Sequence, residues 1–249
     1  MAAARIDLDT AEMPTLRIGL KWDAAAGDVL KDAFGFGSQL AVKAKLGAAK
    51  LRLAVLNPVF KVTGAMRQQH SRLSRQIAAM EGFLEHGGLP SSDLDLYCYC
   101  YDASGQLLAL IAPNAEDSRG ATGIKAWIVH SGDEQTGVSS GFDEEILIDL
   151  AELDETVAQI VIVVMCASGT FRQIKGGKCA AINPETREFL VACDLASRDE
   201  QAFVFAQLRH AGPGWQLVSI GEYCQTPAGG AMDDAMDGIL RTQYVARAA

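Results

Sequence analysis

The acidic stretch His130–Ile146 carries the side chains of this sequence best suited to chemistry. Aspartates, glutamates, three glycines and four hydroxyl residues lie there between two apolar runs that we predict as strands, Ile124–Val129 and Ile146–Leu150. Burying such a stretch is costly, because charges and unpaired backbone groups lose their water. A hard cation with oxygen ligands, calcium first, would offset the repulsion among the carboxylates. The spacing does not fit an EF-hand, so a solvated acidic loop is the alternative interpretation.

A second acidic pair, Asp93 and Asp95, stands at the start of an alternating run that predicts a strand over residues 93–102. The period of two puts the pair on one face with the tyrosines Tyr97, Tyr99 and Tyr101, and puts Leu94, Leu96, Cys98 and Cys100 on the other. Many strands begin with such residues. The pair is therefore informative only if the fold brings it beside Asp133 and Asp143.

Other candidates for chemistry are His130 and the cysteines Cys98 and Cys100. They could belong to a hydrolase or a thiol-dependent reductase, but apolar surroundings favour inert thiols, and a histidine at a strand end is more often structural. The sequence contains no G-x-S-x-G, no P-loop and no G-x-G-x-x-G that opens a helix. None of the six cysteines forms a C-x-x-C pair, which argues against a zinc ribbon. We predict that the protein is not an enzyme.

The elements that must position these residues are mostly strands. Leu16–Trp22 alternates as a half-buried strand, and from Asp93 onward short strand-like runs follow one another with turns between them. This spacing is typical of a β-sandwich or barrel. Residues 224–249 form a tail whose apolar spacing after Gly230 fits a docking helix or a frayed end.

Residues 24–92 differ in character, with nine lysines and arginines against four acidic residues. Met66–Leu84 has the spacing of an amphipathic helix, so we predict a basic, partly helical insertion. It could contact an anionic membrane surface, an acidic partner or the acidic remainder of the chain. The alternative is a helix packed on the β domain with its charges in water.

The whole chain has 249 residues and a net charge of -9, which argues against a nucleic-acid binder. Residues 1–13 lack the apolar core of a signal peptide. The longest apolar run, Ile160–Ala167, is far shorter than the roughly 18 residues of a membrane span. We therefore expect a cytoplasmic protein, with peripheral contact at the inner membrane face through the insertion as an option.

Several motifs, in order, resemble the TerD family of tellurium-resistance and stress-response proteins. They are Gly19-Leu20-Lys21-Trp22-Asp23, Asp93-Leu94-Asp95, His130-Ser131-Gly132-Asp133 with Thr136-Gly137, and Gly141-Phe142-Asp143-Glu144-Glu145 with the strand after it. The resemblance covers residues 16–23 and 93–223. It implies a two-sheet β-sandwich that binds Ca²⁺ through loops at one end. Carried over to this chain, the implied ligands are Asp93, Asp95, Asp133, Asp143 and Glu144, with Thr136 and Gly137 as further oxygen donors.

The motifs also depart from the family pattern. Glu134 replaces a usual asparagine, Ser140 and Phe142 stand at acidic positions, and Asn114 is the nearest counterpart of an Asn-Asn pair. Fewer carboxylates imply weaker calcium binding or fewer sites. We thus expect a calcium-binding scaffold or switch that acts with other stress or tellurium-resistance proteins. The alternative is an ion-independent interaction protein that uses the insertion at residues 24–92.

Overall fold

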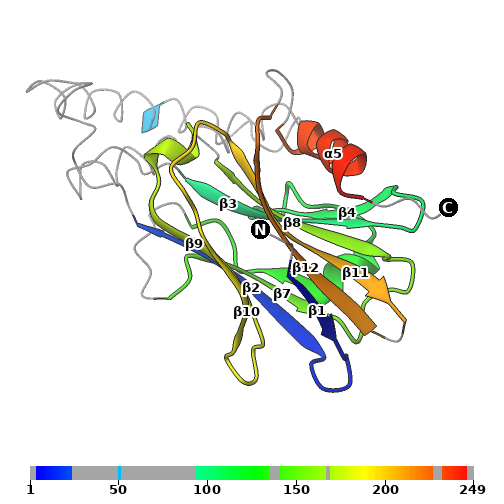
Figure 1. Ribbon diagram of the computed structural model, residues 1–249. Helices are drawn as coiled ribbons and strands as arrows, with labels where there is room; N and C mark the ends of the chain where they lie inside the picture. Colours follow the sequence, from blue (N-terminus) through cyan, green and yellow to red (C-terminus); the bar gives the residue numbers. More distant parts are fainter. Residues whose placement is uncertain are drawn as a thin grey trace, which may run out of the picture.

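Two antiparallel sheets stacked face to face form the body of the described part of the chain, as the computed structural model in Figure 1 shows. The structure describes residues 4–23, 50–51, 93–134, 141–166, 169–212, 214–226 and 232–245. The predicted mostly-β, two-sheet sandwich is confirmed. The insertion predicted at residues 24–92 lies outside the described residues, apart from Lys50 and Leu51.

The first sheet has seven strands in the order β1-β12-β11-β8-β3-β4-β5. Their bounds are β1 Arg5–Leu8, β12 Gly214–Cys224, β11 Ala202–Ala211, β8 Gln159–Cys166, β3 Leu94–Tyr101, β4 Leu107–Ile111 and β5 Arg119–Gly120. β8 lies at its centre and is buried along its whole length. This explains why its sequence is a continuous apolar run instead of an alternating one.

The second sheet has five strands in the order β10-β9-β2-β7-β6. Their bounds are β10 Phe189–Asp194, β9 Lys175–Ile182, β2 Thr15–Asp23, β7 Glu144–Asp149 and β6 Ile128–His130. A short 3-10 helix, η1, at Phe171–Gln173 precedes β9. Strand β2 lies in the middle and pairs with β9 on one side and β7 on the other.

The core between the sheets is built from alternate residues of each strand. Leu16, Ile18 and Leu20 of β2 meet Leu94 and Leu96 of β3 in one cluster of buried side chains. The predicted alternation of β3 is confirmed, because the tyrosines of this strand lie in a separate cluster on the opposite face.

That opposite face of the seven-stranded sheet is covered by helix α5, Met232–Gln243 (Figure 1). Met236 and Leu240 of the helix are fully buried against the sheet. Tyr101 donates a hydrogen bond from its hydroxyl to Asp237 Oδ1 at 3.0 Å. Of the two options for the tail, the docking helix is therefore the correct one over these residues.

Two elements differ from expectation. The run Ile124–Val129, predicted as a strand, begins instead with helix α4 at Thr122–Trp127 and only then enters β6. Ile124 is buried on one side of this helix. One helical turn brings Ile128 back to the same side, so the apolar spacing fits a helix and a strand equally well. β1 was not predicted at all.

No helix in the described ranges has both the length and the apolar content that crossing a membrane requires.

Candidate metal centre

Five strand ends meet at one pole of the sandwich. Strand β2 ends beside the start of β7, where Leu20 pairs with Glu144. Strand β3 begins next to the end of β8, where Leu94 pairs with Cys166. The loop after β6 leaves at the same corner, since Ser131 donates its backbone N–H to the Glu145 carbonyl at 2.8 Å. Acidic residues that are distant in the sequence are thereby brought together.

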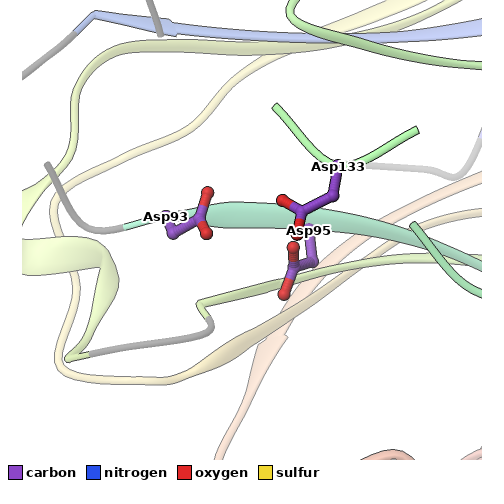
Figure 2. Close-up of side chains that lie close together, drawn as sticks. All are labelled: Asp93, Asp95 and Asp133. Carbon is purple, nitrogen blue, oxygen red and sulfur yellow. The ribbon is translucent and has the colours of Figure 1, made fainter. Parts of the chain in front are cut away.

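Asp93, Asp95 and Asp133 form a cluster in which one carboxylate oxygen of each lies within 4.8 Å of the others. Figure 2 shows Asp133 reaching from its loop toward the start of β3, where Asp93 and Asp95 lie. Asp95 is buried, and the other two are half-buried. The structure thus brings together three of the residues predicted as metal ligands.

Asp93 is in an unfavourable position for a negative charge. Its Oδ1 atom is buried and has no hydrogen-bond partner within the described part of the chain. Burial, followed by the charges of Asp95 and Asp133, raises the pKa of Asp93 to about 9. Without a cation, the cluster therefore holds a proton at neutral pH.

Glu144, at the start of β7, lies fully buried beside this cluster. Its Oε2 accepts the backbone N–H of Leu96 at 2.8 Å, and its Oε1 accepts that of Glu134 at 3.3 Å. Burial raises its pKa to about 9, although these two hydrogen bonds act in the opposite direction. Glu144 therefore ties the first turn of the acidic loop to strand β3.

His130 completes this connection. The backbone N–H of Gly132 donates to its Nδ1 at 2.9 Å, so Nε2 carries the proton and donates to the Leu96 carbonyl at 3.0 Å. Its Nε2 is 3.5 Å from Glu144 Oε2. Burial lowers the pKa of His130 to about 4, so the ring is neutral at physiological pH. This arrangement is structural, and the ring faces a backbone carbonyl.

Asp143, also predicted as a metal ligand, contacts strand β2 instead of joining the three-carboxylate cluster. Its Oδ2 accepts the backbone N–H of Trp22 at 2.9 Å, and its Oδ1 lies 3.5 Å from Lys21 Nζ. Its side chain is completely buried, and it is not among the described carboxylates that converge on the cluster. Asp143 thus connects the end of β2 to the start of β7.

The neighbouring residue, Phe142, packs its ring on Gly19 of β2. A Cβ atom at position 19 would come within 2.6 Å of this ring.

The predicted donors Thr136 and Gly137 lie outside the described residues. Asn114, noted in the sequence only as a displaced counterpart, is in fact at the site, with its Nδ2 3.4 Å from Asp133 Oδ2. Leu96 was not identified from the sequence, and it contributes its backbone N–H and carbonyl groups as hydrogen-bond partners of Glu144 and His130. No signal in a side-chain pattern could have indicated it.

The cysteines near the pole have the properties of inert thiols. Cys98 and Cys100 are fully buried, with their Sγ atoms 4.0 Å apart, and burial raises the pKa of Cys98 well above its usual value. Cys166 lies next to Asp95 and Asp93, and burial together with their charges raises its pKa to about 12. The donors of the cluster are therefore oxygens, which is the set preferred by hard cations.

Comparison with known proteins places these features in context. The TerD domain family model matches residues 86–231. Tellurium resistance protein TerZ of Serratia marcescens is 27% identical over 184 residues, covering 72% of this chain and 91% of TerZ. General stress protein 16U of Bacillus subtilis is 30% identical over 141 residues, covering 52% of this chain and 69% of that protein.

The fold is shared with solved structures as well. The crystal structure of a homologue of telluride resistance protein from Streptomyces coelicolor A3(2) superposes with a TM-score of 0.54 at 14% identity. The match covers 95% of this chain and 99% of the other. At this identity the comparison supports the common fold alone.

Proposed function

The chain belongs to the TerD domain family of tellurium-resistance and stress proteins, and from this premise we propose that it is a calcium-dependent scaffold or switch. In this proposal Asp93, Asp95 and Asp133 bind the ion. The protein then acts in the cytoplasm through other stress or tellurium-resistance proteins and carries out no catalysis itself.

The observation that supports calcium is the convergence of three carboxylates within 4.8 Å, one of which has a buried oxygen without a hydrogen bond in the described chain. A buried carboxylate oxygen without a partner is costly. Proteins retain such an arrangement where a ligand satisfies it. Carboxylate oxygens from two separate segments also match the coordination that calcium prefers.

The residues around the cluster have distinct tasks. Asp95 holds a fixed position because β3 is paired with β8 on one side, and Asp93 directly precedes the first paired residue of this strand. Asp133 is oriented by Asn114 and by the backbone bonds of its loop to Glu144 and His130. When bound, calcium supplies the positive charge that offsets the repulsion among these carboxylates. The loop and the start of β3 would then form one rigid surface for a partner.

The direct test is a calcium titration of the purified full-length protein after chelation, followed by calorimetry and by the melting temperature. We expect binding with a rise in melting temperature, since a ligand that binds only the folded state stabilises it. The double variant Asp95→Asn, Asp133→Asn should lose both signals.

Asp7→Asn is the matched control. Asp7 is an exposed carboxylate of β1 whose Oδ1 accepts a hydrogen bond from Gln216 at 2.8 Å, an interaction that an asparagine can retain. This variant should respond to calcium as the unmodified protein does. If the unmodified protein shows neither heat of binding nor a shift in melting temperature, the calcium proposal is wrong, and an ion-independent interaction protein is the better description.

A further inference from the structure

Two cysteines face each other across the edge of the five-stranded sheet. Cys179 of β9 and Cys193 of β10 are direct partners in the antiparallel register. Both side chains are on the inner face of the sheet, where Cys179 belongs to the core and Cys193 packs against it. Both are free thiols.

The hydrogen-bond ladder defines the geometry of this pair. The backbone N–H of Leu195, directly after the end of β10, donates to the Gly177 carbonyl of β9 at 2.7 Å, two residues further along than the cysteine pair. Hydrogen-bonded pairs alternate with non-hydrogen-bonded ones, so Cys179 and Cys193 occupy a hydrogen-bonded position with Cα atoms about 5.5 Å apart. Disulfides span Cα separations of about 4.4–6.8 Å, but their Cβ atoms lie about 3.5–4.5 Å apart, closer than in an ordinary hydrogen-bonded pair. A bond between the two would therefore keep the register and draw the two strands together locally.

The two thiols differ in access. Cys179 is fully buried, whereas Cys193 is half-buried. β10 is the last strand of its sheet, and its register shifts between Phe189 and Val191. A small reagent would therefore reach Cys193 first, with Cys179 behind it as the resolving thiol.

We propose that Cys179 and Cys193 form a redox-modified site that closes to a cross-strand disulfide with a hydroperoxide as oxidant. The Cys193 thiolate attacks the peroxide, the O–O bond breaks, and a sulfenic acid forms as the alcohol or water leaves. The Cys179 sulfur then displaces the sulfenic hydroxyl, which leaves as water with the remaining thiol proton. In total, two thiols are oxidised to one disulfide, and one hydroperoxide is reduced to an alcohol and water.

The surroundings determine the rate and the consequence of this reaction. Burial raises the pKa of both thiols, so the thiolate is scarce at neutral pH and the bond should form faster as the pH rises. Once formed, the bond would join the edge strand covalently to β9. Since it closes the β9–β10 hairpin in the unfolded chain as well, the oxidised protein should melt at a higher temperature.

The test treats the folded, full-length protein with hydrogen peroxide, blocks the remaining thiols and digests the product with trypsin. Cleavage after Lys178, Arg187 and Arg198 places the two cysteines in separate peptides, residues 179–187 and 188–198. We expect these peptides to be joined by a bond that a reductant cleaves, with two of the six thiols lost. A bond between Cys98 and Cys100 would stay within one peptide and cannot be mistaken for it.

Cys193→Ser should abolish the joined peptides, and Cys193→Ala provides a second variant in case the serine disturbs folding. Cys224→Ser is the matched control, because Cys224 is also half-buried but belongs to the other sheet. It should leave the joined peptides unchanged. Sulfinic acid at Cys193 with Cys179 still reduced, or no loss of thiols in the folded protein, would overturn the proposal.

Discussion

Replacing Asp93 by asparagine should stabilise the calcium-free protein, although most substitutions of half-buried residues are destabilising. The reason is that the crowded, buried site keeps Asp93 protonated at neutral pH, whereas the unfolded chain has released this proton, so folding must pay for its uptake. Two unit charges 4.8 Å apart, the limit found for this cluster, repel each other by about 3 kcal/mol at an effective dielectric constant of about 20 and by about 1 kcal/mol in bulk water. Asparagine keeps the shape of the side chain and is neutral in both the folded and the unfolded state, so folding needs neither the proton nor the repulsion that the proton avoids.

We therefore expect the free energy of unfolding in a chelator to rise by about 1–3 kcal/mol in Asp93→Asn. Calcium at about 100 times its dissociation constant should stabilise the unmodified protein by about 2.7 kcal/mol. The variant lacks one carboxylate ligand and should gain much less. The same substitution thus increases stability without the ion and decreases the response to it.

Urea unfolding followed by fluorescence, with and without calcium, measures both quantities on the same samples. Asp7→Asn again serves as the control and should change neither. The reasoning is refuted if Asp93→Asn is destabilised in the chelator, or if it gains as much from calcium as the unmodified protein does. The first result would mean that the cluster is not under electrostatic strain, and the second that Asp93 is not a ligand.

Three further predictions follow from the same structure. Because the pKa values of Asp93 and Glu144 are raised to about 9, the folded protein holds protons that the unfolded chain has released. The free energy of unfolding in a chelator should therefore fall as the pH rises from about 7 to 9, as urea melts will show, and calcium should flatten this dependence. Gly19→Ala should cost about 1–3 kcal/mol in thermal melts because of the ring above it, whereas Gly141→Ala, with open space around its Cβ position, should cost much less. Leu240→Ala should cost about 2–5 kcal/mol in urea melts if helix α5 is an integral part of the fold, since its side chain is fully buried.

Much of the fold was predictable because its signals are local. The alternation over residues 93–102 identified both the strand and the face on which each residue lies. The short segment that forms α4 and β6 was predicted as a strand throughout, because a single turn of helix and a short strand place apolar residues equally well. β1 has four residues and only one buried side chain, so its partner β12 decides its structure.

The site was harder to predict because it depends on contacts between distant segments. The sequence indicated which residues are acidic, and the family resemblance indicated which of them lie in loops at the same end of the sandwich. Neither the sequence nor the resemblance indicated that Asp143 would instead pair with Lys21 and accept a hydrogen bond from the backbone of Trp22. Nor did they reveal Asn114 beside Asp133, because 19 residues separate the two in the chain.

The corner formed by Glu144 and His130 shows why fold and metal chemistry share the same short stretch. The pairing of β3 with β4 begins only at Cys98, so Leu96 has no β4 partner for its N–H and carbonyl groups. Buried backbone groups need partners, and here the Glu144 carboxylate accepts the N–H while the neutral His130 ring donates to the carbonyl. These two side chains thus take the place of a strand and join the sheets at the pole. Removing Glu144 would disturb this corner as well as any bound ion, and a loss of calcium response in that variant would have two explanations. Asp93, Asp95 and Asp133 are therefore the positions at which the role of the ion can be separated from that of the fold.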